Sequence, residues 1–360
     1  MDTLLFYINS IHGGGAERVI IQLAHDFAKA GYRAILVTSF VDEGKEYAVP
    51  ENVERLSIED VEIKQSRLKK NISRISALRK IIKREKPVAV ISFMAEPNFR
   101  AVIATRGLKT KLIVSVRNDP NREYEGRLGR FIGRHILTHA DGCVFQTEDA
   151  KQWFPRKLQA KSQVIMNDVK EEFFAVERKN PRNIVSVGRL SEQKNHSLLI
   201  KTFAKIADKY PEDKLLIYGT GSLKETLNQL IEALDLKNRV ILMGATKDVP
   251  SVLASTKIFA LSSDYEGMPN CLMEALAAGV PCISTDCPCG GPRALIKDGE
   301  DGLLIPVGDE DAMAQSLDRL LADFGYSESL GKKAKENAKR FHPDIIFEEW
   351  KDYVEQVINR

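Results

Sequence analysis

The stretch LSSDYEGMPNCLMEALAAGVPCISTD, residues 261–286, constrains the fold of this chain more than any other. Its pattern predicts a strand, a loop, a short helix and a second strand, with Pro269 at the first helical position and Gly279 closing the helix. This succession is typical of a parallel α/β sheet. The first N–H groups of such a helix have no carbonyl partner within the helix, so they can bind a phosphate. We expect three residues to provide them: Asn270, Cys271 and Leu272.

Two carboxylates flank this predicted phosphate site. Glu266 lies in the loop before the helix, and Glu274 lies one turn into it. Carboxylates repel a phosphate, but they accept strong hydrogen bonds from the hydroxyl groups of a sugar or a ribose. A phosphate between two hydroxyl-rich units is what a nucleotide sugar presents. The alternative is a capped surface helix with two solvated acids.

Cations and glycines follow other predicted strands. The strand Asn183–Gly188 runs into Arg189 and Lys194. Open α/β sheets bind ligands at the carboxyl ends of their strands, so these two cations are expected to meet an anion. Glycines let a backbone approach a ligand closely. Six of them are expected to line the nucleotide-sugar site: Gly14, Gly15, Gly188, Gly219, Gly221 and Gly244.

The pattern Glu266-x7-Glu274 contains GxPN and is followed by AxGxPxI. It resembles the donor-binding motif of the retaining glycosyltransferases of family 4, also called glycosyl transferases group 1. The resemblance implies an α/β fold of the GT-B type, in which two doubly wound Rossmann-like domains face a cleft. The motif GRLxxxKN, which begins at Gly188, is also similar to a motif of the family. This resemblance implies that Arg189 and Lys194 contact the donor diphosphate. Together with Glu266, which would orient the sugar, they are the expected catalytic residues.

The N-terminal region fits this family with one departure. Gly13-Gly14-Gly15 follows the predicted strand Leu4–Ile8, and the resemblance implies that this loop faces the donor phosphates and the acceptor. Much of the family has a histidine near the end of the strand that here is Leu112–Val116. This chain has Arg117 and Asn118 instead. The candidate sugar or acceptor contacts are therefore three: His12, Arg117 and Asn118.

A chain of 360 residues suits two domains, each with its own core. We expect an N-terminal acceptor-binding domain over residues 1–168 and a nucleotide-sugar-binding domain over residues 169–342. The resemblance implies that residues 343–360 form a terminal helix crossing back to the first domain. Residues 1–168 carry 28 Lys and Arg against 20 Asp and Glu, a net charge of +8, and the remainder carries 25 against 30, a net charge of −5. Such an asymmetry indicates different partners for the two halves.

The segment Lys64–Lys86 holds ten Lys and Arg against Glu85 alone. Its apolar residues recur at helical spacing. One interpretation is a helix that covers the sheet and has a basic outer face. The other is a helix face that meets an anionic membrane surface and a lipid-linked acceptor. Both can hold. The residues of the stripe are Leu68, Ile72, Ile75, Leu78 and Ile82.

Other features bear on location and partners. No signal segment and no membrane-spanning apolar run is visible, so we expect a cytoplasmic protein that is peripheral on the inner face of the plasma membrane. We expect no nucleic-acid partner, since no motif combines aromatic and basic residues. Four of the five cysteines cluster at residues 271–289, but their spacing favours reduced thiols over a metal cluster. The DxD at Asp309–Asp311 is expected to cap a helix, so we expect neither a metal nor a cofactor.

These observations predict retaining transfer of a hexose or N-acetylhexosamine from a nucleotide diphosphate sugar. The resemblance implies a uridine diphosphate donor. The expected acceptor is a surface glycan or a lipid-linked saccharide. Two alternatives stay open: a catalytically silent nucleotide-sugar-binding protein, and a GT-B epimerase or phosphorylase.

Overall fold

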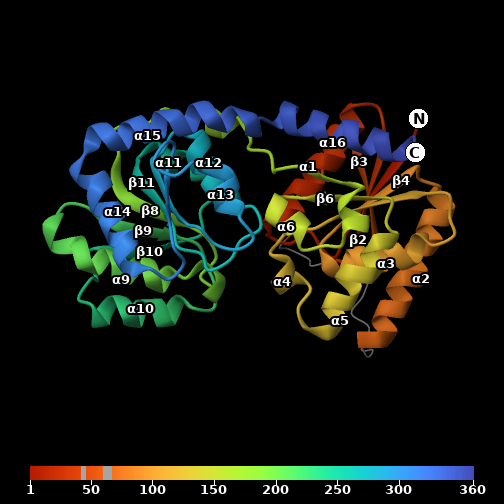
Figure 1. Ribbon diagram of the computed structural model, residues 1–360, viewed down its shortest axis with the longest axis horizontal. Coiled ribbons are helices and arrows are strands. Elements are labelled where there is room, and N and C mark those ends of the chain that lie inside the picture. The colour runs from red at the N-terminus through yellow and green to blue at the C-terminus, as the bar shows by residue number, and fades with distance from the viewer. Residues whose placement is uncertain (42–45, 60–66) are drawn as a thin grey trace. The chain divides into compact units, whose positions relative to one another are not determined.

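The computed structural model describes residues 1–41, 46–59 and 67–360, and these fold into two compact units (Figure 1). The N-terminal unit comprises Met1–Asn167 with Asp344–Arg360, and the C-terminal unit comprises Asp168–Pro343. Each unit is an α/β domain built on one parallel sheet. The predicted positions Lys64–Ser66 of the basic segment lie outside the described residues.

The N-terminal sheet has seven strands in the order β3-β2-β1-β4-β5-β6-β7. Its strand order reverses between β1 and β4, which pair in parallel. At such a switch point the loops that leave neighbouring strands diverge and make room for a ligand. The strands are β1 (Thr3–Ile8), β2 (Arg33–Phe40), β3 (Val53–Glu59), β4 (Ala89–Phe93), β5 (Lys111–Ser115), β6 (Gly142–Phe145) and β7 (Ser162–Val164).

Helices cover both faces of this sheet. Residues on one face of β1, such as Phe6, share a core with α1 (Gly15–Lys29) and with α16 (Pro343–Ile358). Tyr7 points to the opposite face and is also fully buried. Of the remaining helices, α2 (Arg67–Glu85) packs beside α3 (Ala95–Thr105), and α3 lies against β4 and β5. Burial on both faces explains why the strands read as continuous apolar runs.

The apolar stripe predicted for the basic segment is buried at some positions of α2 and exposed at another, and the side chain of Leu68 lies outside the described residues. Leu78 and Ile82 are buried, with exposed fractions of 0% and 1%, but Ile72 is 60% exposed. The interpretation in which the stripe packs inward therefore does not extend to Ile72. Helical periodicity identifies which residues share a face, but it does not show how far along the helix that face is covered.

Helix α16 returns to the N-terminal unit, as the resemblance implied. Trp350 is buried and stacks on Phe93 with ring centroids 5.9 Å apart. The Tyr353 hydroxyl accepts a hydrogen bond from the Cys143 N–H at 2.7 Å and donates one to the Lys161 carbonyl at 2.6 Å. These contacts join the C-terminal helix to β6 and to the residue before β7.

The C-terminal sheet has six strands in the order β10-β9-β8-β11-β12-β13. Its switch point lies between β8 and β11, which pair in parallel. The strands are β8 (Arg182–Val187), β9 (Leu215–Tyr218), β10 (Val240–Gly244), β11 (Thr256–Leu261), β12 (Cys282–Thr285) and β13 (Leu303–Ile305). The main helices are α9 (His196–Ile206), α10 (Lys224–Ala233), α11 (Val249–Ala254), α12 (Asn270–Ala277), α13 (Gly291–Leu295), α14 (Glu310–Ala322) and α15 (Phe324–Asn337).

The expected cap at the DxD is confirmed. The Asp309 carboxylate accepts a hydrogen bond from the Ala312 N–H at 2.8 Å and so begins α14. Asp311 lies in the first turn and pairs with Lys205 at 2.7 Å. In the described part of the chain, no helix is long and apolar enough to cross a membrane.

Candidate active site

Helix α12 begins one residue later than predicted. Pro269 is the N-cap, and Asn270 is the first helical residue. The Pro269 carbonyl accepts hydrogen bonds from the Leu272 N–H at 3.0 Å and the Met273 N–H at 3.2 Å. The expectation that the Leu272 N–H is free for a phosphate is therefore wrong, because the N-cap carbonyl takes part in the first helical turn. Asn270 and Cys271 stay the candidates at this helix start.

The end of α12 matches its prediction. Gly279 has a φ of +73°, which a residue with a side chain rarely adopts. The Gly279 N–H bonds the Leu276 carbonyl at 3.0 Å, and the Val280 N–H bonds the Ala275 carbonyl at 3.0 Å. This pair of bonds is a Schellman motif. It ends the helix and directs the chain into β12.

Lys194 and Glu266, both expected to be catalytic, form a direct ion pair. The Lys194 Nζ lies 2.5 Å from Glu266 Oε1, and the two side chains are 12% and 8% exposed. The same carboxylate oxygen accepts a hydrogen bond from Ser263 Oγ at 2.7 Å. Burial alone lowers the pKa of the Lys194 ammonium, but the charge and hydrogen bond of Glu266 raise it, and the net pKa lies above its ordinary value. Lys194 therefore stays protonated in this setting.

Hydrogen bonds between two loops hold this pair in place. The Asn195 side-chain amide donates to Asp264 Oδ1 at 2.8 Å, and the Asp264 N–H donates to the Gln193 carbonyl at 2.9 Å. The Ser262 hydroxyl donates to the Lys194 carbonyl at 2.9 Å. The loops can meet in this way because β8 and β11, which they follow, are neighbours in the sheet.

Arg189 and His196 lie beside the pair. Arg189 is exposed, and its positive charge is close enough to lower the pKa of Lys194. His196 is 2% exposed, and burial followed by the Lys194 charge lowers its pKa to about 4. The imidazole is therefore neutral at neutral pH, and its nitrogens lie buried against the backbone of Gly188 and Arg189. Sequence analysis did not select His196, whose only signal was its place directly after Asn195.

Two glycines after β9 allow close backbone packing against the loop after β8. A Cβ on Gly219 would lie 1.9 Å from the Gly188 carbonyl oxygen, and one on Gly221 would lie 2.2 Å from the Leu190 carbonyl oxygen. The close approach that these glycines permit is therefore to the neighbouring loop. Their contact with a nucleotide, and that of Gly244 after β10, stay predictions.

Two further residues of the predicted donor site lie on α12. Glu274 is 6% exposed, so its carboxylate is largely enclosed. Burial raises the pKa of the Cys271 thiol to about 11, so this cysteine stays a neutral thiol. Neither side chain brings a positive charge to a phosphate, so the backbone N–H groups at the start of α12 stay the candidates for that contact.

The predicted contacts in the N-terminal unit follow β1 and β5. Gly14 is the N-cap of α1, and Gly15 is its first residue. The backbone of His12 pairs with that of Glu46 in an isolated antiparallel β-bridge. Asn118 uses its side-chain oxygen to accept a hydrogen bond from the Asp119 N–H at 2.9 Å.

Arg117 is directed into the unit and is only 7% exposed. Its guanidinium donates to Asn167 Oδ1 and to Ser115 Oγ, and it lies 4.6 Å from the centre of the Phe93 ring. Little of this group is available to a sugar. Its main visible role is to hold the ends of β4 and β5 together.

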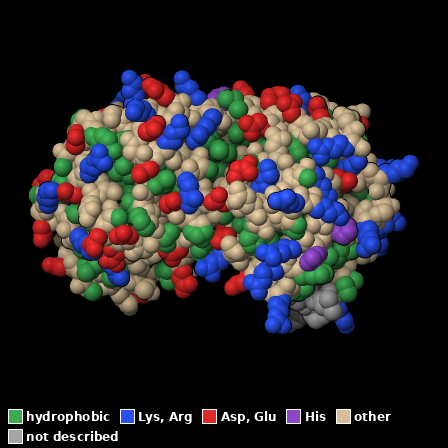
Figure 2. Space-filling view, viewed as in Figure 1, with side chains coloured by type: hydrophobic (Ala, Val, Ile, Leu, Met, Phe, Trp, Pro, Cys, Tyr) green, Lys and Arg blue, Asp and Glu red, His purple; other side chains and the backbone are tan. Residues whose placement is uncertain are grey.

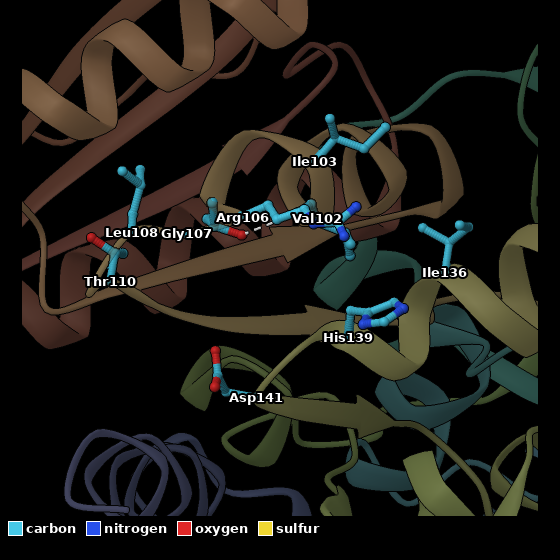
Figure 3. Close-up of a pocket in the computed structure, with 10 residues that line it drawn as sticks. Val102, Ile103, Arg106, Gly107, Leu108, Thr110, Ile136, His139 and Asp141 are labelled. Carbon is cyan, nitrogen blue, oxygen red and sulfur yellow. Dashed lines mark hydrogen bonds between the residues drawn. The ribbon is translucent and has the colours of Figure 1, made fainter.

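A cavity of about 320 Å³ lies elsewhere in the N-terminal unit (Figure 3). Its lining comes from the end of α3, the turn before β5 and the residues before β6, so it is at the amino ends of the strands. Asp141 in this lining accepts a hydrogen bond from the Leu112 N–H at 2.8 Å, which is a structural role. Open α/β sheets bind ligands at the opposite, carboxyl edge. The cavity is therefore separate from the candidate active site.

Two Rossmann-like domains with cations, carboxylates and a helix start at strand ends are the arrangement expected of a GT-B glycosyltransferase. Two family models match: Glycosyltransferase Family 4 over residues 13–172, and Glycosyl transferases group 1 over residues 168–338. An uncharacterized glycosyltransferase of Methanocaldococcus jannaschii is 31% identical over 80% of this chain and 84% of its own length. The chain belongs to glycosyltransferase family 4, and its C-terminal domain matches the model called glycosyl transferases group 1.

Two further similarities extend over nearly the whole chain. A Campylobacter jejuni protein is 28% identical over 100% of both chains, and its name is GalNAc-α-(1→4)-GalNAc-α-(1→3)-diNAcBac-PP-undecaprenol α-1,4-N-acetyl-D-galactosaminyltransferase. A solved structure of Anabaena HepE in complex with UDP and glucose has a TM-score of 0.83 at 18% identity, covering 99% of this chain and 100% of that one. The structural similarity confirms the GT-B fold.

We predict strong coupling between Lys194 and Glu266 in the stability of the C-terminal unit. Lys194→Met leaves a buried carboxylate without its partner, which typically costs about 3–5 kcal/mol. Glu266→Gln should cost less in the Lys194→Met background than in the wild type, because the unpaired charge has then been removed. Chemical denaturation of the wild type, both single variants and the double variant measures this. Additive losses would show that the pair is not coupled.

Proposed function

We propose that this chain is a retaining glycosyltransferase that moves a hexose or N-acetylhexosamine from a UDP-sugar to a lipid-linked or polysaccharide acceptor. The observation that carries the proposal is the buried Lys194–Glu266 pair beside the start of α12, in a member of this family. A protonated amine and helix N–H groups suit a diphosphate, and two carboxylates suit the hydroxyl groups on either side of it.

The named relatives support the substrate classes. The Campylobacter jejuni relative is named for an acceptor linked to undecaprenol through a diphosphate. The Anabaena structure holds UDP and glucose. A UDP-sugar donor and a lipid-linked saccharide acceptor are therefore the substrates that we propose for this chain.

In the proposed reaction, an acceptor hydroxyl oxygen forms a bond to the anomeric carbon while the bond from that carbon to the diphosphate oxygen breaks. The proton of the hydroxyl passes to the departing phosphate, and attack comes from the same face as departure. Arg189 and Lys194 neutralise the negative charge that develops on the diphosphate. Glu266 orients a sugar hydroxyl and also fixes Lys194, and Glu274 accepts from the ribose.

We predict that Arg189→Ala lowers turnover by about 10²–10³, the usual effect of removing one donor to a developing oxyanion. Arg189 is exposed, so its loss should leave the fold intact. Arg182→Ala, at an exposed position at the start of β8, is the matched control. Steady-state transfer from UDP-sugars with circular dichroism measures both. Near-normal turnover of folded Arg189→Ala would remove this residue from the mechanism.

The same assay separates the alternatives. A silent binding protein would bind the nucleotide sugar without turnover, even to hydrolysis. A phosphorylase would release sugar phosphate when inorganic phosphate is supplied. An epimerase would change the sugar without transferring it.

We predict that transfer needs no divalent metal. Two protein cations and the start of α12 already provide positive charge for the diphosphate. Asp309 of the DxD is used as a helix cap. Turnover should therefore be unchanged in excess chelator. Loss of turnover that magnesium restores would contradict this charge assignment.

We also propose that the N-terminal unit meets an anionic membrane. Figure 2 shows Lys and Arg side chains gathered over its lower part, with hydrophobic side chains among them. On α2, Ile72 is 60% exposed among exposed lysines. On α5 (Gly126–Phe131), Leu128 is 71% and Phe131 is 52% exposed. Exposed apolar residues within a basic surface are typical of interfacial membrane contacts.

We predict that changing four lysines of α2 to Glu abolishes sedimentation with anionic liposomes. Each Lys near such a surface contributes about 1 kcal/mol at low salt. The four are Lys69, Lys70, Lys80 and Lys83.

The control changes four exposed lysines of the C-terminal unit to Glu, which alters the net charge equally. Sedimentation of the control should match that of the wild type. If the α2 variant still sediments, the helix is not the membrane contact. The control residues are Lys224, Lys237, Lys332 and Lys333.

A further inference from the structure

Buried polar atoms without hydrogen-bond partners gather at the carboxyl ends of β4 and β5. Within the described residues, both carboxyl oxygens of Glu123 are buried and unpartnered, and so are the Tyr124 hydroxyl and Asn98 Oδ1. Glu123 ends the short helix α4 (Pro120–Glu123), which follows β5. Buried polar atoms in native proteins are nearly always paired, so this concentration requires an explanation.

Backbone N–H groups from two loops face the Glu123 carboxyl. Those of Ala95, Arg117 and Asn118 are close enough to lower its pKa, although none completes a hydrogen bond. Ala95 is the first residue of α3, where Met94, the N-cap, provides no side-chain cap. The positive end of a helix dipole favours an anion at this point. An ionised Glu123 would therefore bind the segments that leave β4 and β5.

Burial opposes that ionisation. It is the largest influence on Glu123 and raises its pKa to about 7, although the N–H groups and the Arg117 guanidinium lower it. Three titratable groups of the described residues interact with Glu123: Tyr124, Cys143 and Arg117. Burial raises the pKa of Tyr124 and of Cys143 well above their ordinary values. Arg117 is protonated throughout.

We propose that Glu123 is a positioning residue whose ionised carboxylate holds Met94–Ala95 and Arg117–Asn118 in the arrangement that receives the saccharide acceptor. The inference rests on the proposed function. Both segments leave strands at the carboxyl edge of the sheet, where open α/β sheets bind ligands. Protonation removes the anion that these N–H groups face, so the two segments lose their common anchor.

Stability and activity should then respond to pH in opposite directions. The pKa of Glu123 in the folded state is raised above its ordinary value of 4.5. Its contribution to stability is therefore fully present below that ordinary value and is lost as the pH rises through about 7. The kcat/KM for the acceptor should instead increase as the pH rises toward about 7, because only the ionised carboxylate positions the two segments. A purely structural residue would not produce this opposition.

The test is the pH dependence of kcat/KM for the acceptor, at saturating UDP-sugar, between pH 5.5 and 8.5. For the wild type it should rise about tenfold per pH unit below the inflection and then level off. Glu123→Gln should be about tenfold or more below the wild type at pH 8 and should lack the inflection. Glu125→Gln, at an exposed position two residues further on, should follow the wild type.

Thermal unfolding of the same proteins provides the second measurement. Glu123→Gln should be more stable than the wild type at pH 8, and this difference should shrink toward pH 5. An unchanged inflection in Glu123→Gln, or a loss of activity equal at every pH, would overturn the inference. If Glu123→Gln does not fold, Glu123→Asp takes its place. Glu123→Asp should shift the inflection of the kcat/KM profile, and an unshifted inflection would overturn the inference. Absence of transfer by the wild type at any pH would overturn the proposed function itself, and this inference with it.

Discussion

The rest of the candidate site depends on the ion pair between Lys194 and Glu266. Two opposite charges with this little exposure are stable only when each has its partner and further hydrogen bonds. Ser263 supplies one such bond, and the contacts of Asn195 with Asp264 keep the two loops in register. The pair therefore fixes the ammonium group beside the start of α12. The catalytic proposal depends on that fixed position.

Sheet topology makes this arrangement possible. The loops after β8 and β11 are separated by more than sixty residues in the sequence, but their strands are adjacent at the switch point. The N-terminal sheet reverses its order in the same way between β1 and β4. Its strand-end segments carry the candidate acceptor contacts and the buried Glu123. Each unit thus brings its candidate site residues to the carboxyl edge of its own sheet, where open α/β sheets bind ligands.

Residue types and spacing predicted parallel α/β sheets, and the resemblance to family 4 implied the GT-B fold. Both led to Lys194 and Glu266, whose catalytic role stays a prediction. Their direct contact could not be predicted, because sequence order does not show which strands are neighbours. The Leu272 N–H was wrongly expected to be free, since a shift of one residue in the helix start changes which groups are bonded. Helical spacing placed Ile72 on the apolar stripe, but it did not show that this residue is exposed. Glu123 lies in the polar stretch RNDPNREYEGR, and nothing there indicated burial.

If the site around Lys194 and α12 binds the diphosphate of the donor, the phosphate groups should provide most of the affinity for the nucleotide. The most direct measurement is the affinity of the full chain for UDP compared with uridine, by calorimetric titration in metal-free buffer. We expect UDP to bind at least about a hundredfold more tightly than uridine, since charge-assisted hydrogen bonds to the diphosphate contribute about 1.5–3 kcal/mol each. Equal affinities for UDP and uridine would contradict it.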